Sequence, residues 1–205
     1  MHEHEKFKNF EDYLYNQYML GPETIQLIRD RSKIITVPKN SFLLSQGRVC
    51  KYVYFIQSGQ AISYLTDSAG RSNTWFFHFN GGNNHIENVF AVDYKSFLVS
   101  DPSSISIKTL TEVTAVQLSK EDLNLMLKVS YAFENWIRIL NEKIFILVFN
   151  RTRSLLTMSA SERYIQMLHN EPYLFNMFSS YYIATYLGIA PQSLSRIRKS
   201  AIRSA

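Results

Sequence analysis

The carboxyl-terminal part of the sequence combines cationic, amide and hydroxyl side chains in one short stretch. Gln192, Arg196 and Lys199 lie off the apolar positions of that stretch, so a helix there would leave them unburied. An arginine can donate two parallel hydrogen bonds to a guanine, and a glutamine can pair with an adenine. These contacts are typical of a helix in the major groove of double-stranded DNA. The predicted DNA-contacting residues are Ser179, Ser180, Pro191, Gln192, Ser193, Ser195, Arg196, Arg198, Lys199 and Arg203.

The element predicted to position these side chains is a helix-turn-helix. Gly188 permits the turn between two short helices, and Pro191 suits the first turn of the second helix, where its missing N–H is no loss. Ser179 or Ser180 can cap the first helix. The competing interpretation is a solvated helical hairpin whose cations only keep it soluble. The shared apolar seam consists of Ile183, Ala184, Leu187, Ile189, Leu194 and Ile197.

The net charge of +5 belongs to one end of the chain. Residues 1–150 contain 15 Lys or Arg and 15 Asp or Glu, whereas residues 151–205 contain seven Lys or Arg against Glu162 and Glu171. A basic excess gathered in one segment is the electrostatic footprint expected where phosphates are contacted. The charge distribution therefore favours a nucleic-acid partner for the carboxyl-terminal part.

The composition indicates a globular protein of a reducing compartment. Hydrophobic residues make up 46% of the 205 residues, which suffices for packed cores. Cys50 is the single cysteine, so one chain cannot build a disulfide framework, a cysteine-ligated iron–sulfur cluster or a zinc finger. No run reaches the roughly 18 apolar residues of a membrane span, and we expect a cytoplasmic location. We predict no metal, no cofactor and no enzymatic activity.

The first 120 residues predict helices followed by a β-roll. Apolar residues recur at helical spacing from Phe7 to Ile28, with Gly21-Pro22 breaking the run into two helices. Short β-branched and aromatic segments separated by turns then suggest an antiparallel barrel or jelly roll, so the fold class is α+β. The predicted strands are 34–37, 41–44, 52–56, 61–65, 73–79, 105–110 and 114–118.

A long helix follows, and we predict that it forms a homodimer. Its apolar residues alternate spacings of four and three in a seam about three heptads long. A second neighbour, the roll of the same chain, is indicated by Trp136, Phe145, Ile146 and Phe149. The predicted dimer interface is Phe133, Trp136, Ile137, Leu140, Ile144, Leu147 and Arg151.

A capping box marks the predicted domain boundary. In Ser159-Ala-Ser-Glu162, the hydroxyl and the carboxylate can satisfy each other's free N–H groups at the start of a new helix. We therefore predict a β-roll sensor domain with its N-terminal helices over residues 1–120, a long dimerisation helix over 121–156, and a helix-turn-helix domain over 157–205.

The order of these elements resembles the Crp/Fnr family of bacterial transcription regulators. The likeness runs from about Ile34 to Lys199, and it looks like the branch common in the Bacteroidetes. It implies a cyclic-nucleotide-binding-domain-like jelly roll, a homodimer, and double-stranded DNA and RNA polymerase as partners. The motifs that carry it are SFLLSQG (41–47), YVYFIQSG (52–59), SASERY (159–164) and IATYLGIAPQSLSRIR (183–198).

By this resemblance, Gln192 and Arg196 stand where family members read base edges, and Ser193 stands where a hydroxyl meets a phosphate. Pro191 replaces a base-reading arginine of the better-known members, so the target sequence should differ from theirs. Family members usually add a two-stranded wing after the recognition helix. Because the sequence ends six residues past Lys199, we expect a helix-turn-helix without a full wing.

The sensor half departs from the family pattern at its ligand pocket. Members that bind cyclic nucleotides hold the cyclic phosphate with an arginine, and Ser103 stands at that position. A buried phosphate without a cation is costly, so we expect an effector other than cyclic AMP or GMP. Glu87, Ser103 and Ser104 could instead line a pocket for a neutral molecule, whose identity the sequence does not give.

Two other functions are compatible with parts of the sequence. One is a ligand- or protein-binding β-roll sensor that no longer reads DNA, which the missing wing would suit. The other is a cupin-type metal enzyme built in the same kind of barrel, with His78, His85 and Glu87 as its candidate ligands. A cupin site requires further histidines downstream, and the sequence contains no such cluster.

Overall fold

The computed structural model describes residues 3–81 and 86–203, with side-chain surroundings for residues 7–81 and 88–199. Two helices open the chain, α1 (Glu3–Tyr18) and α2 (Pro22–Asp30). They are separated where Gly21-Pro22 predicted a break, because Pro22 starts α2 and its ring cannot continue a preceding helix. None of the helices within the described ranges is both long and apolar enough to cross a membrane.

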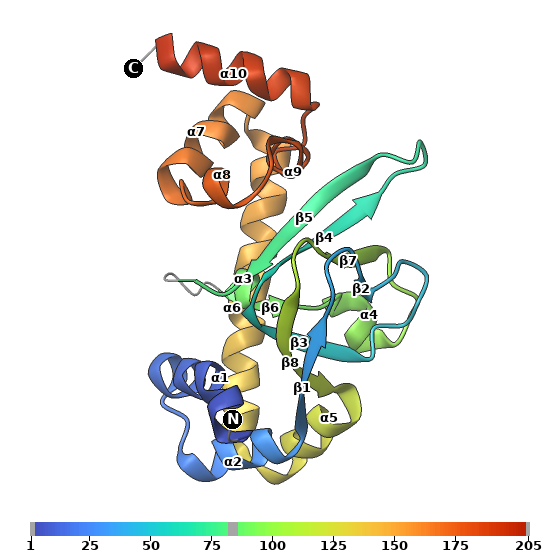
Figure 1. Cartoon of the computed structure of the whole chain (residues 1–205), viewed down its shortest axis with the longest axis vertical. Helices are drawn as coiled ribbons and strands as arrows, with labels where there is room; N and C mark the ends of the chain where they lie inside the picture. The colour runs from blue at the N-terminus through green and yellow to red at the C-terminus, as the bar shows by residue number, and fades with distance from the viewer. Residues whose placement is uncertain (1–2, 82–85, 204–205) are drawn as a thin grey trace. The chain divides into compact units, whose positions relative to one another are not determined.

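Two four-stranded sheets form the β-roll (Figure 1). All seven predicted strands are present, and their pairing is antiparallel wherever the register is defined, as for Ile35 opposite Ala115. The strand β6 was not predicted, because two residues are too few to show alternation. One sheet contains, in order, β1 (Ser32–Val37), β8 (Val113–Ser119), β3 (Tyr52–Ser58) and β6 (Phe90–Ala91); the other contains β2 (Phe42–Leu44), β7 (Ile105–Thr109), β4 (Gln60–Thr66) and β5 (Ser72–Phe79).

Alternation along β3 and β8 divides the side chains between two cores. Tyr54 and Ile56 belong to a core with strand residues of both sheets, including Ile107. Phe55 points to the opposite face of its sheet, where it belongs to a core with helix residues such as Phe10. The β-roll is therefore filled by its own strands on one face of this sheet and covered by helices on the other.

Four helices supply the covering layer on the outer face of that sheet, namely α1, α2, α5 (Lys120–Val129) and α6 (Tyr131–Thr157). Ser119 caps α5, because its Oγ accepts a hydrogen bond from the N–H of Asp122 at 3.0 Å. Ser130 has extended backbone angles and separates α5 from α6. The segment 121–156, predicted as one long helix, therefore consists of α5 and most of α6.

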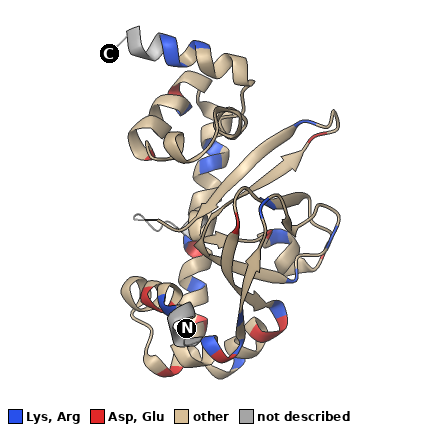
Figure 2. Cartoon of the chain, in the orientation of Figure 1, with Lys and Arg blue, Asp and Glu red and all other residues tan. Residues whose placement is uncertain are grey.

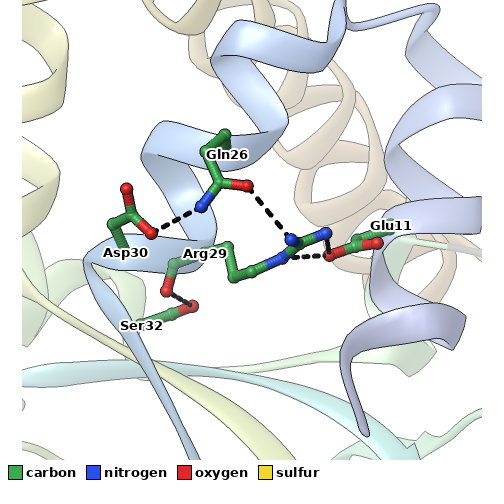
Figure 3. A network of polar contacts seen from close by, with 5 residues as sticks. All are labelled: Glu11, Gln26, Arg29, Asp30 and Ser32. Carbon is green, nitrogen blue, oxygen red and sulfur yellow. Dashed lines mark hydrogen bonds and ion pairs between the residues drawn. The ribbon is translucent and has the colours of Figure 1, made fainter. Parts of the chain in front are cut away.

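A polar network joins the first two helices (Figure 3). The guanidinium of Arg29 on α2 forms an ion pair with the carboxylate of Glu11 on α1, and it also donates to Gln26 Oε1 at 3.0 Å. Gln26 donates in turn to Asp30 Oδ1 at 2.6 Å, and the Ser32 hydroxyl donates to the Arg29 carbonyl at 3.2 Å. The network fixes α2 against α1 and leads directly into β1.

The chain folds as two compact units whose limits differ from the predicted domains. The roll unit comprises residues 1–63 and 77–144, and the helical unit comprises residues 64–76 and 145–205. The division falls inside α6, and the tip of the β4–β5 hairpin belongs to the helical unit. The roll unit also contains the short helices α3 (Ile86–Val89) and α4 (Tyr94–Val99); the helical unit contains α7 (Ala160–Asn170), α8 (Leu174–Met177), α9 (Ser180–Tyr186) and α10 (Pro191–Arg203).

Candidate nucleic-acid interface

The helices α9 and α10 meet at a turn that requires glycine. Gly188 has a φ of +70°, which other residues rarely adopt, and the N–H of Ile189 donates to the Ala184 carbonyl across the turn at 3.0 Å. Leu187 and Leu194 are buried between the two helices, as the apolar spacing predicted. The predicted pair of helices with a shared seam is therefore present, and Pro191 occupies the first position of α10.

The exposed face of α10 carries cations without acids (Figure 2). The side chains of Gln192, Ser195, Arg196 and Lys199 are exposed, and Ser193 is half-buried. Arg196 lies along the helix and donates to Ser193 Oγ at 3.2 Å. The structure therefore brings most of the predicted DNA-contacting residues of α10 onto one solvent-facing surface. Arg203 also belongs to α10, but its side chain lies outside the described residues.

Arg198 is half-buried and contacts other residues of the helical unit. Its Nη1 donates to Ser180 Oγ at 3.3 Å, and its Cζ lies 5.5 Å from the ring centroid of Phe175. Ser179 occupies the cap position of α9, although its side chain makes no capping hydrogen bond. Both serines are exposed. Arg198 thus braces α10 against α8 and α9, a role that its position in the sequence did not reveal.

Two arginines from other helices hold the carboxyl end of α9. Arg163 on α7 donates from Nε and Nη2 to the Leu187 carbonyl at 3.0 and 2.8 Å, and Arg151 on α6 donates to the Tyr186 carbonyl at 3.1 Å. The last carbonyls of a helix lack partners within the helix and carry partial negative charge, so cations there are favourable. Sequence reasoning missed Arg163, which follows the capping-box glutamate and shows no distinguishing spacing.

The predicted dimer seam lies largely inside the chain's own core. Phe133, Trp136 and Leu140 are buried against α1 and the roll, with Phe133 at 0% exposure, and Ile137 is partly buried beside them. They stabilise the roll unit and leave no surface for a second copy. The seam was misassigned because a periodic apolar stripe does not tell which neighbour covers it. Ile144 and Leu147 are half-buried, and Arg151 contacts residues of its own chain.

The exposed apolar face of α6 is the one that we expected to contact the roll. Phe145 is 71% exposed, Phe149 58% and Leu156 80%, and Ile146 is exposed beside them. The rings of Phe145 and Phe149 stack with centroids 6.5 Å apart. Their spacings of four and seven residues place them on one side of the helix. The apolar face that we expected to contact the roll is therefore exposed in this chain.

Ser103, a predicted pocket residue, is bonded inside the roll unit. Its hydroxyl lies 2.6 Å from Asp93 Oδ2, to which it can donate, and accepts from the N–H of Ile105 at 3.1 Å. Asp93 is buried too, and it caps α4 by accepting from the N–H of Ser96 at 3.2 Å. The serine therefore completes an internal network around a buried acid. Asp93 was missed by the sequence analysis, although an Asp ahead of a short helix is a recognisable cap.

Of the other predicted pocket and metal residues, the structure describes the side chains of Ser104 and His78 only. Ser104 is exposed, and the side chain of Glu87 lies outside the described residues, as does His85. His78 is buried, and its Nε2 shares a hydrogen bond of 3.1 Å with Ser63 Oγ. Within the described part of the chain, no three His, Cys, Asp or Glu side chains gather where they could hold a metal.

A polar hollow of about 320 Å³ opens beside α1 in the roll unit. Gln57 of β3 is nearly buried there, on the face of its sheet that α1 covers, and its Nε2 has no partner among the described residues. No described cation lines the hollow, so its chemistry does not suit a phosphate. The described lining residues are Asn9, Asp12, Tyr13, Asn16, Gln17, Gln57 and Asn80.

Comparisons with known proteins agree with this architecture. Residues 34–130 match the family described as the cyclic nucleotide-binding domain. No curated protein sequence matches the chain. Among solved structures, FixK2 from Bradyrhizobium japonicum has a TM-score of 0.68 at 14% identity, with 84% of this chain and 85% of that chain covered.

Two further structures resemble the chain over most of its length. A protein of Eubacterium rectale assigned to the Crp/Fnr family of transcriptional regulators has a TM-score of 0.67 at 18% identity, with 93% of this chain and 87% of that chain covered. CLP, a global regulator from Xanthomonas campestris that responds to c-di-GMP, has a TM-score of 0.64 at 15% identity, with 90% and 93% covered. The roll thus has the jelly-roll fold of cyclic nucleotide-binding domains, and the neighbours from Eubacterium rectale and Xanthomonas campestris are regulators.

Proposed function

We propose that this chain is a sequence-specific, DNA-binding transcription regulator of the Crp/Fnr type, and not an enzyme. The observation that carries the proposal is the exposed face of α10, where Arg196 and Lys199 project with no acid on the helix. The regulators with the same fold support it. In this proposal α9 and α10 form a helix-turn-helix, with α10 as its recognition helix.

The proposed mechanism assigns a role to each exposed group of α10. Gln192 and Arg196 contact base edges in the major groove, while Lys199 and the hydroxyls of Ser193 and Ser195 contact phosphates. A homodimer through the exposed face of α6 presents two copies of α10 to successive major grooves, about 34–36 Å apart along the duplex. RNA polymerase is the proposed protein partner at the promoter, and the cytoplasm is the proposed location.

The roll is proposed to act without a cyclic nucleotide. Its Ser103 hydroxyl is bonded to the buried carboxylate of Asp93, so a cyclic phosphate brought there would meet an acid instead of a cation. Burying a phosphate in such surroundings costs far more than a hydroxyl contact returns. We therefore expect no saturable binding of cyclic AMP or cyclic GMP, measured by titration calorimetry.

Selection of duplexes from a random pool, followed by a salt series, tests the proposal. If six phosphates are neutralised, a plot of log affinity against log salt has a slope of about −5. Arg196→Ala should weaken binding and relax specificity at one base position, while the exposed Arg48→Ala on the roll should leave both unchanged. Affinity that is insensitive to salt, or that survives Arg196→Ala, would contradict the proposal.

A further inference from the structure

An aromatic cage surrounds the guanidinium of Arg151 in the helical unit. Its Cζ lies 3.8 Å from the ring centroid of Tyr186, 5.1 Å from that of Trp75 and 5.7 Å from that of Phe76. Its Nη2 donates to the carbonyls of Thr74 and Tyr186, each at 3.1 Å. Three aromatic rings and two carbonyls thus contact one cation, an arrangement that arginine suits because its planar group stacks and donates together.

The cage holds its cation through rings and carbonyl groups, and Glu171 adds a favourable electrostatic interaction. The Nε of Arg151 is buried without a hydrogen-bond partner in the described part of the chain. Burial lowers the pKa of this guanidinium below its usual value, and the nearby Tyr186 and Glu171 act in the opposite direction. A desolvated cation of this kind contributes little net stability. It strongly disfavours any arrangement of the surrounding segments in which the guanidinium loses its carbonyl partners.

The cage joins three segments that are distant in the sequence. Arg151 comes from α6, Tyr186 from the carboxyl end of α9, and Thr74 to Phe76 from within β5. A buried hydrogen bond of 2.8 Å between the hydroxyls of Thr74 and Thr185 links the hairpin to α9 a second time. The same strand continues into the roll unit, because β5 ends at Phe79.

We infer that the Arg151 cage is a clamp that fixes the α9–α10 pair on α6, and that β5 of the β4–β5 hairpin completes it. The inference rests on the proposed function, since the clamp matters for DNA reading. Phe145 and Phe149 lie on the same helix as Arg151 and form the proposed dimer face. Fixing α9 on that helix sets the separation of the two α10 helices in a dimer. Arg151 is therefore a positioning residue and touches no base itself.

The clamp leaves the DNA-facing groups free. It contacts the carboxyl half of α9, at Thr185 and Tyr186, whereas Ser179 and Ser180 at the other end are exposed. The hairpin can therefore act on the position of α10 without covering it. A displacement of β5 that withdraws Trp75 and Phe76 would open the cage. A conformational change that moves β5 would therefore change the position of α10.

Duplexes with two selected half-sites at varied spacing test the clamp. The full-length protein should prefer one spacing by about tenfold over spacings changed by two base pairs, because rigid linkage raises the effective concentration of the second α10 only there. Arg151→Gln should reduce this preference to about twofold, yet bind a single half-site as the unmodified protein does. Arg151→Lys, which keeps the charge but not the planar fork, should behave like Arg151→Gln. The matched control is Arg153→Gln, an exposed arginine two positions along α6.

Retention of the full spacing preference by Arg151→Gln would overturn the clamp. Should that variant fail to fold, Tyr186→Leu removes the nearest ring while keeping the carbonyl, and the same loss of preference is expected. Hydrogen exchange separates this inference from the proposed function, because faster exchange of the amides of Leu187 and Gly188 in Arg151→Gln needs no DNA. Faster exchange in a protein that binds no DNA would leave the clamp standing and the proposed function overturned; unchanged exchange would overturn the clamp.

Discussion

The buried Ser103–Asp93 pair and the exposed face of α10 differ in their electrostatic interaction with an anion, which the first disfavours and the second favours. In the roll unit, the hydroxyl of Ser103 is bonded to a buried acid, so an incoming phosphate would meet that carboxylate. On α10, Arg196 and Lys199 are exposed to solvent with no acid on the helix. The two regions belong to different compact units. Substitutions can therefore alter the charge of one region without altering that of the other. Anion recognition in this chain is therefore expected at α10 and not in the roll.

The strongest way to break this contrast is to remove the cations of α10. Arg196→Ala combined with Lys199→Ala should lower affinity for the selected duplex by about 100-fold or more, since a bidentate base contact is worth about 1–3 kcal/mol and a phosphate contact adds to it. The salt slope should become shallower by about one unit for each lost phosphate contact. Fluorescence anisotropy measures both quantities. An equal loss in the control Arg48→Ala would show that the charge of the whole chain, and not α10, is responsible.

Breaking the dimer should remove the gain in DNA affinity that two linked copies of α10 provide. Phe145→Glu with Phe149→Glu places like charges on the exposed face of α6 and should raise the dimer dissociation constant by about 100-fold. Phe145→Leu with Phe149→Leu keeps the face apolar and serves as the matched control. Sedimentation velocity measures the dissociation constant. An unchanged dimer in the Glu variant would show that another surface joins the copies.

Two neighbouring serines of the roll unit test the contribution of the buried Ser103–Asp93 pair. Ser103→Ala leaves Asp93 and the N–H of Ile105 without their hydroxyl partner, so the free energy of unfolding should fall by about 1–3 kcal/mol. The exposed Ser104→Ala should change it by less than about 0.5 kcal/mol. Urea unfolding compares the two variants. Equal stability in both would mean that the Ser103 network contributes nothing to the roll.

The smallest expected effect concerns the capping box at the start of α7. Hydrogen bonding from the Ser159 N–H, at 2.7 Å, holds the pKa of Glu162 below its ordinary value of 4.5. Because the folded-state pKa is the lower one, the carboxylate contributes stability above about pH 4.5 and loses it as the pH falls through the folded-state value. Glu162→Gln should therefore lower the urea midpoint slightly at neutral pH and have no effect near pH 3. The exposed Glu112→Gln is the control, and a pH-independent difference would contradict the assignment.

Local patterns allowed much of the fold to be predicted. The break at Gly21-Pro22, the cap at Ser159 and the turn at Gly188 each depend on residues close in sequence, so the chain signals them directly. The seven strands were found from short β-branched and aromatic segments separated by turns, which are local signals too. Ser130, which separates α5 from α6, was missed because a serine within a helical pattern is not by itself a break.

Contacts between distant segments could not be predicted in the same way. The seam from Phe133 to Leu140 looked like a dimer surface because a stripe of apolar residues does not identify its neighbour, which is α1 and the roll. The cage of Arg151 joins residues 35 and 77 positions away, and no spacing rule reports such a meeting. Ser103 was assigned to a pocket from its position alone, while its partner Asp93 becomes apparent only in three dimensions.

Sedimentation equilibrium of the protein with a duplex carrying the selected site measures how many chains bind that site. We predict two chains on each duplex, in a complex that dissociates steeply as salt rises and that the Arg196→Ala, Lys199→Ala variant does not form at the same concentration. One chain on each duplex, or a complex that neither salt nor the variant weakens, would contradict this prediction.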